Sequence, residues 1–284
     1  MFKVMAVWTP GGSNTAKFSY GLSREFSQLI NVILVELPCL GIPRLGFAVD
    51  IMDRENHTEA AISELEKKGE LSFAYIHKQG GTLSVLPSSV FAMPDLPLTQ
   101  KVELKTLTDF PGHFSKKARQ QGYGLAIFEC QGQLTNPMTF FAVKNADVVL
   151  MPVNEPWEIA FSLINIKRLV QAFKFEPDKF IAVSRENVET LSEVMVVKDD
   201  VGGEISRIKV LPESYKEIVS DVFFKDDAYR AIITKKKAEE RKNILSHVLG
   251  SKIFKSKKTC ISMKPAEEIE TNCSAGEEAW KIKL

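Results

Sequence analysis

The residues that follow the first apolar run of this chain form a candidate binding site for a phosphate group. Phe2–Trp8 has the composition of a buried strand, and Thr9–Lys17 turns directly into a helical pattern. A strand, a glycine-containing turn and a helix N-terminus together present backbone N–H groups and the positive end of a helix dipole to an anion. We therefore expect this turn to contact phosphate through Gly11, Gly12, Ser13, Asn14, Thr15, Ala16 and Lys17.

The same turn also fits a purely structural role. Ser13 or Asn14 has a side chain that can accept a hydrogen bond from the first free N–H groups of the helix, as N-cap residues do. A capped turn needs no ligand. The residues leave the anion site and the capped turn both open.

Two acidic residues lie at the ends of other apolar segments. Val32–Leu37 is apolar except for Glu36, and Gly124–Glu129 ends in an acid. Near-continuous apolar character is typical of parallel strands that are covered on both faces. Ligands of such sheets bind at the carboxyl ends of the strands, so we group Glu36 and Glu129 with the turn.

The strands and helices expected around these residues alternate along the chain. This alternation predicts an α/β fold with a doubly wound, mostly parallel sheet flanked by helices. Further strands are expected at 82–87, 147–153 and 179–184, and helices with one apolar face at 18–29, 58–68 and 157–173. Pro111 and Gly112 are expected to break or kink a helical pattern over 104–121. Trp157 is interpreted as a packing residue, and 199–203 as a turn between two strands.

Composition excludes several classes of protein. The formal net charge of +1 over 284 residues argues against a globally basic nucleic-acid binder. The sequence has no apolar run long enough for a transmembrane helix and no signal-peptide pattern. The four cysteines form no CxxC pair and suit a reduced cytoplasm, and the four histidines share no spacing with acids. We expect no zinc site, and we expect Cys130 to be a buried small side chain rather than a nucleophile.

The C-terminal fifth differs from the rest of the chain. We predict a main α/β domain over 1–234, a basic amphipathic segment from Lys235 to Lys258, and a disordered tail over 259–284. The basic segment fits a solvated helix face, an element lying on an anionic membrane, or a patch for nucleic-acid phosphates or an acidic protein. Its interleaved apolar residues favour a membrane or a protein over DNA.

Three segments together resemble the ParA/MinD family of P-loop ATPases, the SIMIBI class with a deviant Walker A motif. The run from Pro10 to Ala16 resembles the family pattern Lys-Gly-Gly-x-Gly-Lys-[Ser/Thr]-[Ser/Thr], which directly follows the first strand. Val35–Pro38 lies where the family has a strand ending in Asp-x-Asp, and Tyr123–Gly132 where it has a strand ending in Asp. Asn145–Val153 is similar to another strand of the family. The resemblance implies a P-loop NTPase-like fold and a site for ATP or ADP with Mg²⁺.

The loop departs from the family pattern at each catalytic position. Pro10 stands where the family has its signature lysine, and Asn14 replaces the second loop glycine. Thr15 replaces the phosphate-gripping lysine, and Ala16 the residue whose hydroxyl binds Mg²⁺. If the loop is one residue out of this register, Thr15 supplies the metal hydroxyl instead. Lys17 reaches the phosphates only if the register of the loop against the family pattern is shifted further along the helix.

The two acidic strand ends depart as well. Glu36 keeps an acid, but Pro38 stands where the water-positioning aspartate is expected, and Glu129 replaces the aspartate that orders the metal's water shell. If Mg²⁺ is bound at all, Thr15, Glu36 and Glu129 are the candidate positions. Because phosphoryl transfer depends on such positioned charges, we expect weak or absent ATP hydrolysis.

The resemblance therefore implies a degenerate ParA/MinD-like protein of the bacterial cytoplasm, or of the membrane periphery, that acts through protein contacts. Positioning, assembly and partition factors are the expected class, and the pilus-assembly branch (TadZ/CpaE-like) also has damaged loops. The alternative is a working ATP-dependent switch that dimerises, in plasmid partition, conjugation or pilus assembly. A small-molecule enzyme on a Rossmann-like sheet is disfavoured, because the turn lacks GxGxxG.

Overall fold

The computed structural model describes residues 2–10, 15–38, 43–91, 102–130, 132–186, 188–224, 231 and 234. These residues belong to one compact unit, 1–236. The predicted basic segment 235–258 and the predicted tail 259–284 lie outside the described residues. Gly11, Gly12, Ser13 and Asn14 of the predicted phosphate turn lie outside them too.

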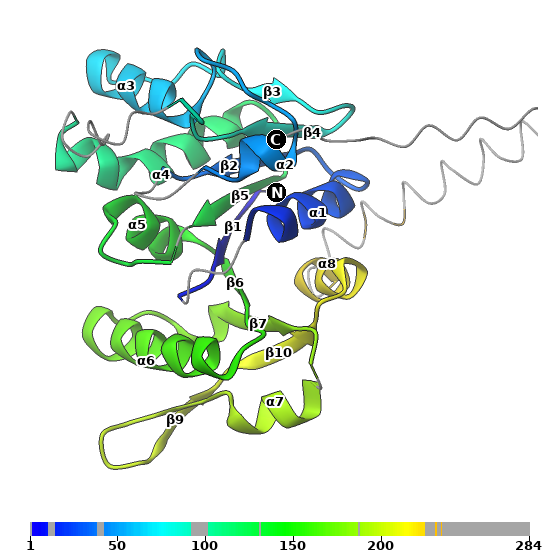
Figure 1. Cartoon of the computed structure of the whole chain (residues 1–284), viewed down its shortest axis with the longest axis vertical. Coiled ribbons are helices and arrows are strands. Elements are labelled where there is room, and N and C mark those ends of the chain that lie inside the picture. Colours follow the sequence, from blue (N-terminus) through cyan, green and yellow to red (C-terminus); the bar gives the residue numbers. More distant parts are fainter. Residues whose placement is uncertain are drawn as a thin grey trace, which may run out of the picture. The chain divides into compact units, whose positions relative to one another are not determined.

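An eight-stranded sheet forms the centre of the described fold, with the strand order β10-β7-β6-β1-β5-β2-β4-β3 (Figure 1). All neighbouring strands are parallel except the pair β3–β4. The strands are β1 (Lys3–Trp8), β2 (Val32–Glu36), β3 (His77–Lys78), β4 (Leu83–Leu86), β5 (Leu125–Cys130), β6 (Val148–Pro152), β7 (Phe180–Ser184) and β10 (Lys209–Pro212). The prediction of a doubly wound, mostly parallel sheet is confirmed.

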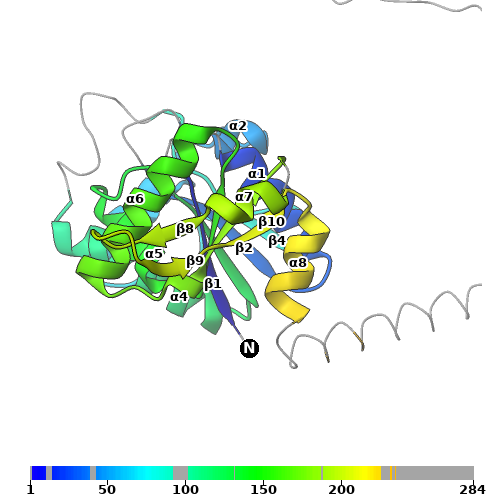
Figure 2. The ribbon, with the colours of Figure 1, turned by 90° about the horizontal axis from the view of Figure 1, so that it is seen from below.

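Helices cover both faces of this sheet (Figure 2). One buried cluster joins the sheet to α3 (Thr58–Lys68), α4 (Leu104–Gln120), α5 (Pro137–Asn145) and α6 (Pro156–Phe173). The other joins it to α1 (Thr15–Ser27), α2 (Leu45–Ala48) and α8 (Tyr215–Phe224). The central strands are therefore buried on both sides, which explains their near-continuous apolar sequence. Helix α7 (Val188–Val194) precedes the antiparallel pair β8 (Val196–Lys198) and β9 (Glu204–Arg207).

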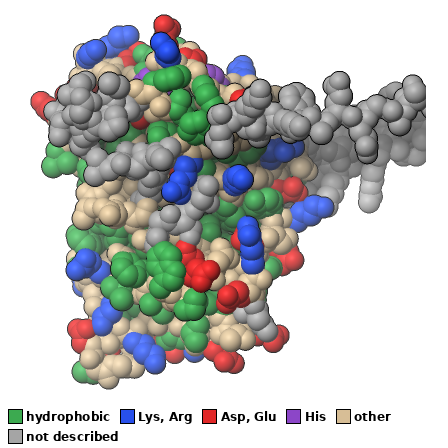
Figure 3. Space-filling model, in the orientation of Figure 1, with side chains coloured by type: hydrophobic (Ala, Val, Ile, Leu, Met, Phe, Trp, Pro, Cys, Tyr) green, Lys and Arg blue, Asp and Glu red, His purple; other side chains and the backbone are tan. Residues whose placement is uncertain are grey.

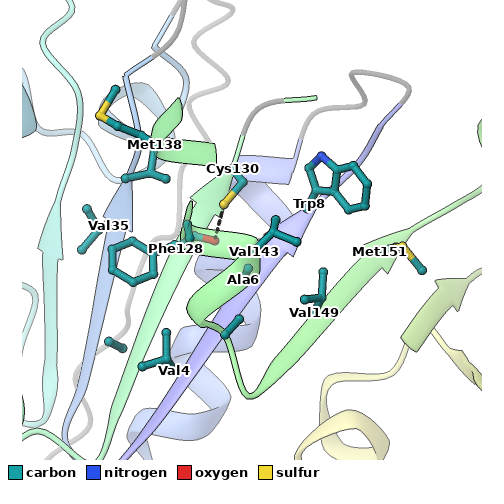
Figure 4. Packing of buried hydrophobic residues seen from close by; sticks show 14 of the residues in the cluster. Val4, Ala6, Trp8, Val35, Phe128, Cys130, Met138, Val143, Val149 and Met151 are labelled. Atoms are coloured by element: carbon teal, nitrogen blue, oxygen red, sulfur yellow. Dashed lines mark hydrogen bonds between the residues drawn. The ribbon is translucent and has the colours of Figure 1, made fainter. Parts of the chain in front are cut away.

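The central strands pack through alternating side chains. On one face Val4, Ala6 and Trp8 of β1 lie beside Phe128 and Cys130 of β5 (Figure 4). Met138 and Val143 of α5 cover this layer, and Val149 and Met151 continue it on β6. The strand ends are held in a fixed register, and that register positions the site described below.

Helix α3 begins and ends as the sequence predicts. His57 caps its first turn by accepting a hydrogen bond from the Ala60 N–H at 3.2 Å. Gly69 ends it with φ of 70°, and its N–H donates to the Leu65 carbonyl. A left-handed residue at this position favours glycine, which explains the sharp end of the helix.

Of the predicted break or kink at Pro111 and Gly112, the break is wrong. Helix α4 continues through both residues, from Leu104 to Gln120. Proline removes one helix hydrogen bond and crowds the preceding turn. Leu107, Phe110 and Phe114 are buried on the same side of α4, and their packing against the sheet exceeds that local cost. The predicted turn at 199–203 is confirmed, since it joins β8 to β9.

Candidate functional site

The candidate site lies where β1, β5 and β2 end, beside the first turn of α1. Parallel pairing places Glu36 of β2 opposite Glu129 of β5, and Trp8 of β1 opposite Cys130 of β5. Thr15 is the first residue of α1. The topology thus brings three of the predicted residues, Thr15, Glu36 and Glu129, to one edge of the sheet.

Glu129 is enclosed by protein. Its side chain is 2% exposed, and Oε1 accepts a hydrogen bond from the Thr15 hydroxyl. Its second oxygen, Oε2, is buried without a hydrogen-bond partner among the described residues. Burial and the negative charge of Glu36 together raise the pKa of Glu129 to about 8, against the opposing effects of Thr15 and Arg44. Glu129 is therefore the carboxyl group of this pair that holds a proton at neutral pH.

Glu36 is equally buried but has more donors around it. Oε1 accepts from the Arg44 N–H at 2.7 Å and the Leu45 N–H at 3.1 Å, and Oε2 accepts from the Ser88 N–H at 2.9 Å. Burial raises the pKa of Glu36 above its ordinary value; these three N–H groups oppose the rise, and the negative charge of Glu59 adds to it. Because three N–H groups donate to Glu36 and a single hydroxyl donates to Glu129, Glu36 is the member of the pair that ionises first. Its carboxylate fixes the start of α2 and the residues after β4.

Side chains at the rim of the site form hydrogen bonds that were not predicted from the sequence. The Asn136 side chain donates to the Pro38 carbonyl at 2.9 Å and accepts from the Met138 N–H at 2.9 Å. The Trp8 indole N–H donates to the Gly132 carbonyl at 3.2 Å. Asn136 followed by proline at the first helical position is an N-cap signature, so the sequence did carry a signal for this residue.

Lys17, the basic residue predicted at the site, is exposed, whereas the two acidic residues are buried. Thr15 and Ala16 are buried, whereas Lys17 is exposed on α1. Pro10 is half-buried at the end of β1, and Pro38 is buried after β2. The described site therefore contains a hydroxyl group and two carboxyl groups, but the lysine ammonium lies on the solvent side of the helix.

These residues do not fit a hydrated Mg²⁺ ion. Thr15 and Glu129 contact each other directly, and both oxygens of Glu36 are used by backbone N–H groups. Pro38 has no carboxylate to add. In the described part of the chain, no group of three or more His, Cys, Asp or Glu side chains could hold a metal ion.

Cys130 and Trp157 are the other two residues for which the sequence predicted a role. Cys130 is fully buried, as predicted, and its thiol lies 3.6 Å from the Phe128 carbonyl (Figure 4). Burial and the nearby Glu129 raise the pKa of this thiol well above its usual value, so it is a poor nucleophile. Trp157 is 51% exposed, which contradicts its interpretation as a packing residue. Among the described residues, no helix is long and apolar enough to cross a membrane.

Comparison with solved structures places this geometry in a known fold. Neither protein-family models nor curated protein sequences match this chain. A plasmid partition protein from Borrelia burgdorferi aligns with a TM-score of 0.56 at 15% identity, covering 79% of this chain and 98% of that chain. The septum site-determining protein MinD from Pyrococcus horikoshii, complexed with Mg-ADP, aligns with a TM-score of 0.53 at 15% identity, covering 75% and 82%. The fold is that of the ParA/MinD-type P-loop ATPases.

Another solved structure has the same fold. The MinC:MinD cell division complex of Aquifex aeolicus aligns with a TM-score of 0.52 at 16% identity, covering 81% of this chain and 93% of that chain. The ParA/MinD-type fold implied by the resemblance is therefore confirmed. Identities of 15–16% establish the fold alone, and the chemistry of the site has to be argued from its own residues.

Proposed function

We propose that this chain is a ParA/MinD-like positioning, assembly or partition factor that acts through protein contacts, with weak or absent ATP hydrolysis. One observation carries the proposal. Both acidic residues at this edge of the sheet are bonded to the protein: Glu36 accepts from three backbone N–H groups through both oxygens, and Glu129 accepts from the Thr15 hydroxyl through Oε1. Carboxylates used in this way do not order the water shell of a metal ion.

The chemistry of phosphoryl transfer supports this reading. The protein contributes to that reaction almost entirely by placing charge around the transferred group, and each such contribution is worth several powers of ten in rate. Pro10 offers no ammonium group, and Lys17 is exposed on the helix. The contact of Thr15 with Glu129 supports the register in which Thr15 occupies the hydroxyl position of the loop. Asn14 then stands in the position of the phosphate-gripping lysine.

The exposed apolar residues on the outer face of α6 support a function through protein contacts. Trp157, Phe161 and Ile164 follow one another at helical spacing and are 51%, 54% and 63% exposed. Figure 3 shows hydrophobic side chains gathered over this helix. Contiguous exposed apolar side chains are a common mark of interaction sites. Among the structures with this fold, one is a MinC:MinD complex and another a plasmid partition protein.

The test is turnover and binding by the purified full-length chain. We expect no ATP hydrolysis above background with Mg²⁺, and calorimetry with ATP, ADP and NAD to give weak or no heat. Lys17→Ala leaves this result unchanged, as does the matched variant Lys67→Ala, an exposed lysine of α3. Mg²⁺-dependent turnover that Lys17→Ala abolishes and Lys67→Ala preserves would falsify the proposal.

The second candidate is a functional ATP-dependent switch. The observation in its favour is the contact of Thr15, at the first turn of α1, with the acid that ends β5. Solved proteins of this fold include MinD with Mg-ADP. This candidate requires a cation at the phosphates, so the same Lys17→Ala experiment decides between the two functions.

A further inference from the structure

The surface between α4 and α5 is hollowed where a row of side chains on α4 is interrupted. The two helices pack side by side (Figure 1). Thr108, Gly112 and Lys116 follow one another at i, i+4 and i+8, so they lie on one ridge of α4. Gly112 leaves a gap in this ridge, and the gap is part of a groove of about 360 Å³. Phe141 and Asn145 line the groove from α5.

The packing of the chain does not require glycine at position 112. Apart from the backbone of its own helix, a β-carbon added to Gly112 would meet one atom within 4 Å, Nδ2 of Asn145 at 3.7 Å, which is an ordinary contact. The backbone of Gly112 is helical, so no left-handed conformation requires glycine either. Glycine inside a helix is less stable than alanine. The chain therefore carries an unfavourable residue whose visible effect is to keep the groove open.

The groove has more positive than negative charge around it. Among its lining residues Asp109 is the one acid, and Lys105, one helical turn earlier, forms an ion pair with it. Lys116 has no ion pair among the described residues. Nor has Lys144 in that part of the chain, and its ammonium group lies 5.4 Å from the centroid of the Phe141 ring. Two ammonium groups therefore remain available to the carboxylates of a partner.

We propose that this groove binds an extended acidic segment of a protein partner. The Phe141 ring and the space over Gly112 receive one apolar side chain of the segment. Lys116 and Lys144 pair with carboxylates that flank this side chain, and the amide of Asn145 bonds the main chain of the segment. The proposal rests on the proposed function, which is action through protein contacts, and specifies the chemistry of one partner.

Other macromolecules fit this lining less well. An amphipathic helix needs a groove with mainly apolar walls, whereas Phe141 is the one aromatic or aliphatic side chain among the lining residues. A nucleic acid would bring phosphate groups close to Asp109. An acidic peptide can place its carboxylates at the lysines and an uncharged residue beside Asp109.

The first experiment selects short random peptides, displayed on phage, on the purified full-length chain. Peptides that also bind the variant Gly112→Leu are removed, because leucine fills the groove and favours the helix. We expect the remaining peptides to be rich in Asp and Glu around one apolar residue. The proposal is overturned if no peptide distinguishes the two proteins, or if the peptides that do so are basic or uncharged.

The second experiment measures the affinity of one retained peptide by fluorescence polarisation. Lys116→Glu should weaken binding about tenfold or more, which is about 1.4 kcal/mol, and added salt should weaken the binding of the original chain. The matched control Lys198→Glu reverses the charge of an exposed lysine on β8 and should keep the affinity within about twofold. An affinity that Lys116→Glu leaves unchanged contradicts the proposal.

A labelled single-stranded oligonucleotide is the competing probe. If it binds the original chain and loses its binding to Gly112→Leu, the groove belongs to a nucleic acid and the proposal is overturned. Turnover of ATP in the same samples is a separate readout. Hydrolysis would defeat the proposed function, whereas peptide binding that depends on Gly112 and Lys116 would still stand.

Discussion

Glu36 and Glu129 have identical side chains, but their surroundings make one carboxyl group easier to ionise than the other. The two residues are opposite each other in neighbouring parallel strands, and both are buried. Two adjacent buried carboxyl groups resist simultaneous ionisation. Three N–H donors stabilise the charge on Glu36, whereas Glu129 has one donor, so the proton stays on Glu129. The local donors, rather than residue type, decide which acid is charged.

This division predicts a pH dependence of stability at Glu129. Its pKa is about 8 in the fold and 4.5 as its ordinary value, so its contribution to stability is full below pH 4.5 and is lost as pH rises toward 8. Glu129→Gln keeps an acceptor for Thr15 and has no proton to lose. The variant should therefore gain stability relative to the original chain between pH 5 and pH 8, by up to about 1.4 kcal/mol per pH unit.

Urea unfolding at pH 5, 6, 7 and 8 measures this gain. Glu193→Gln, which removes one carboxylate from an exposed position of α7, is the matched control. Parallel stability curves for Glu129→Gln and the original chain would show that Glu129 is already ionised in the fold.

At the scale of elements, two helices approach closely where α8 covers α1. The ring of Tyr215 lies directly over Gly21, so that a β-carbon added at Gly21 would meet Cε2 of the ring at 2.6 Å. Phe18 of α1 packs on the same ring, with the centroids 5.7 Å apart. The glycine therefore permits a contact between helices that a larger residue would prevent.

A pair of glycine substitutions tests this packing. Gly21→Ala should lose about 1–3 kcal/mol of stability, because Tyr215 has to move. Gly112→Ala, inside α4, is the matched control. Its added β-carbon meets only Asn145 at 3.7 Å, so the gain in helix propensity of about 0.5–1 kcal/mol should prevail. Chemical denaturation of both variants measures the signs, and two variants of equal stability would contradict the close approach.

At the scale of the whole molecule, the sheet was predictable because its strands are buried on both faces. Continuous apolar runs such as Val32–Glu36 and Leu125–Cys130 have no other common explanation in an α/β sequence. Helix α5 was not predicted, since its apolar and polar residues have little period. The break at Pro111 was predicted wrongly, because tertiary packing of Phe110 and Phe114 outweighed a local preference.

The candidate site was predictable only in part. The edge of the sheet follows from the order of strands, and it does bring Glu36 and Glu129 together. Their hydrogen bonds could not be predicted, because Arg44 and Ser88 lie in connections and Leu45 begins the four-residue helix α2, which is too short to have a periodic pattern. Nor could the solvent position of Lys17 be read from its place in the loop, since one residue of helix rotation separates it from buried Ala16.

The exposure of α6 gives the last prediction, which concerns where the core of the whole molecule ends. Phe161 is 54% exposed on the outer face of α6, whereas Phe110 of α4 is fully buried between helix and sheet. Phe110→Ala should lose about 3–5 kcal/mol, because it removes buried surface and leaves a cavity. Phe161→Ala should change stability by no more than about 0.5 kcal/mol, because its side chain gains little from folding. Urea denaturation measures both free energies. A loss above about 1.5 kcal/mol for Phe161→Ala would mean that this face is covered within the chain itself and is closed to a partner.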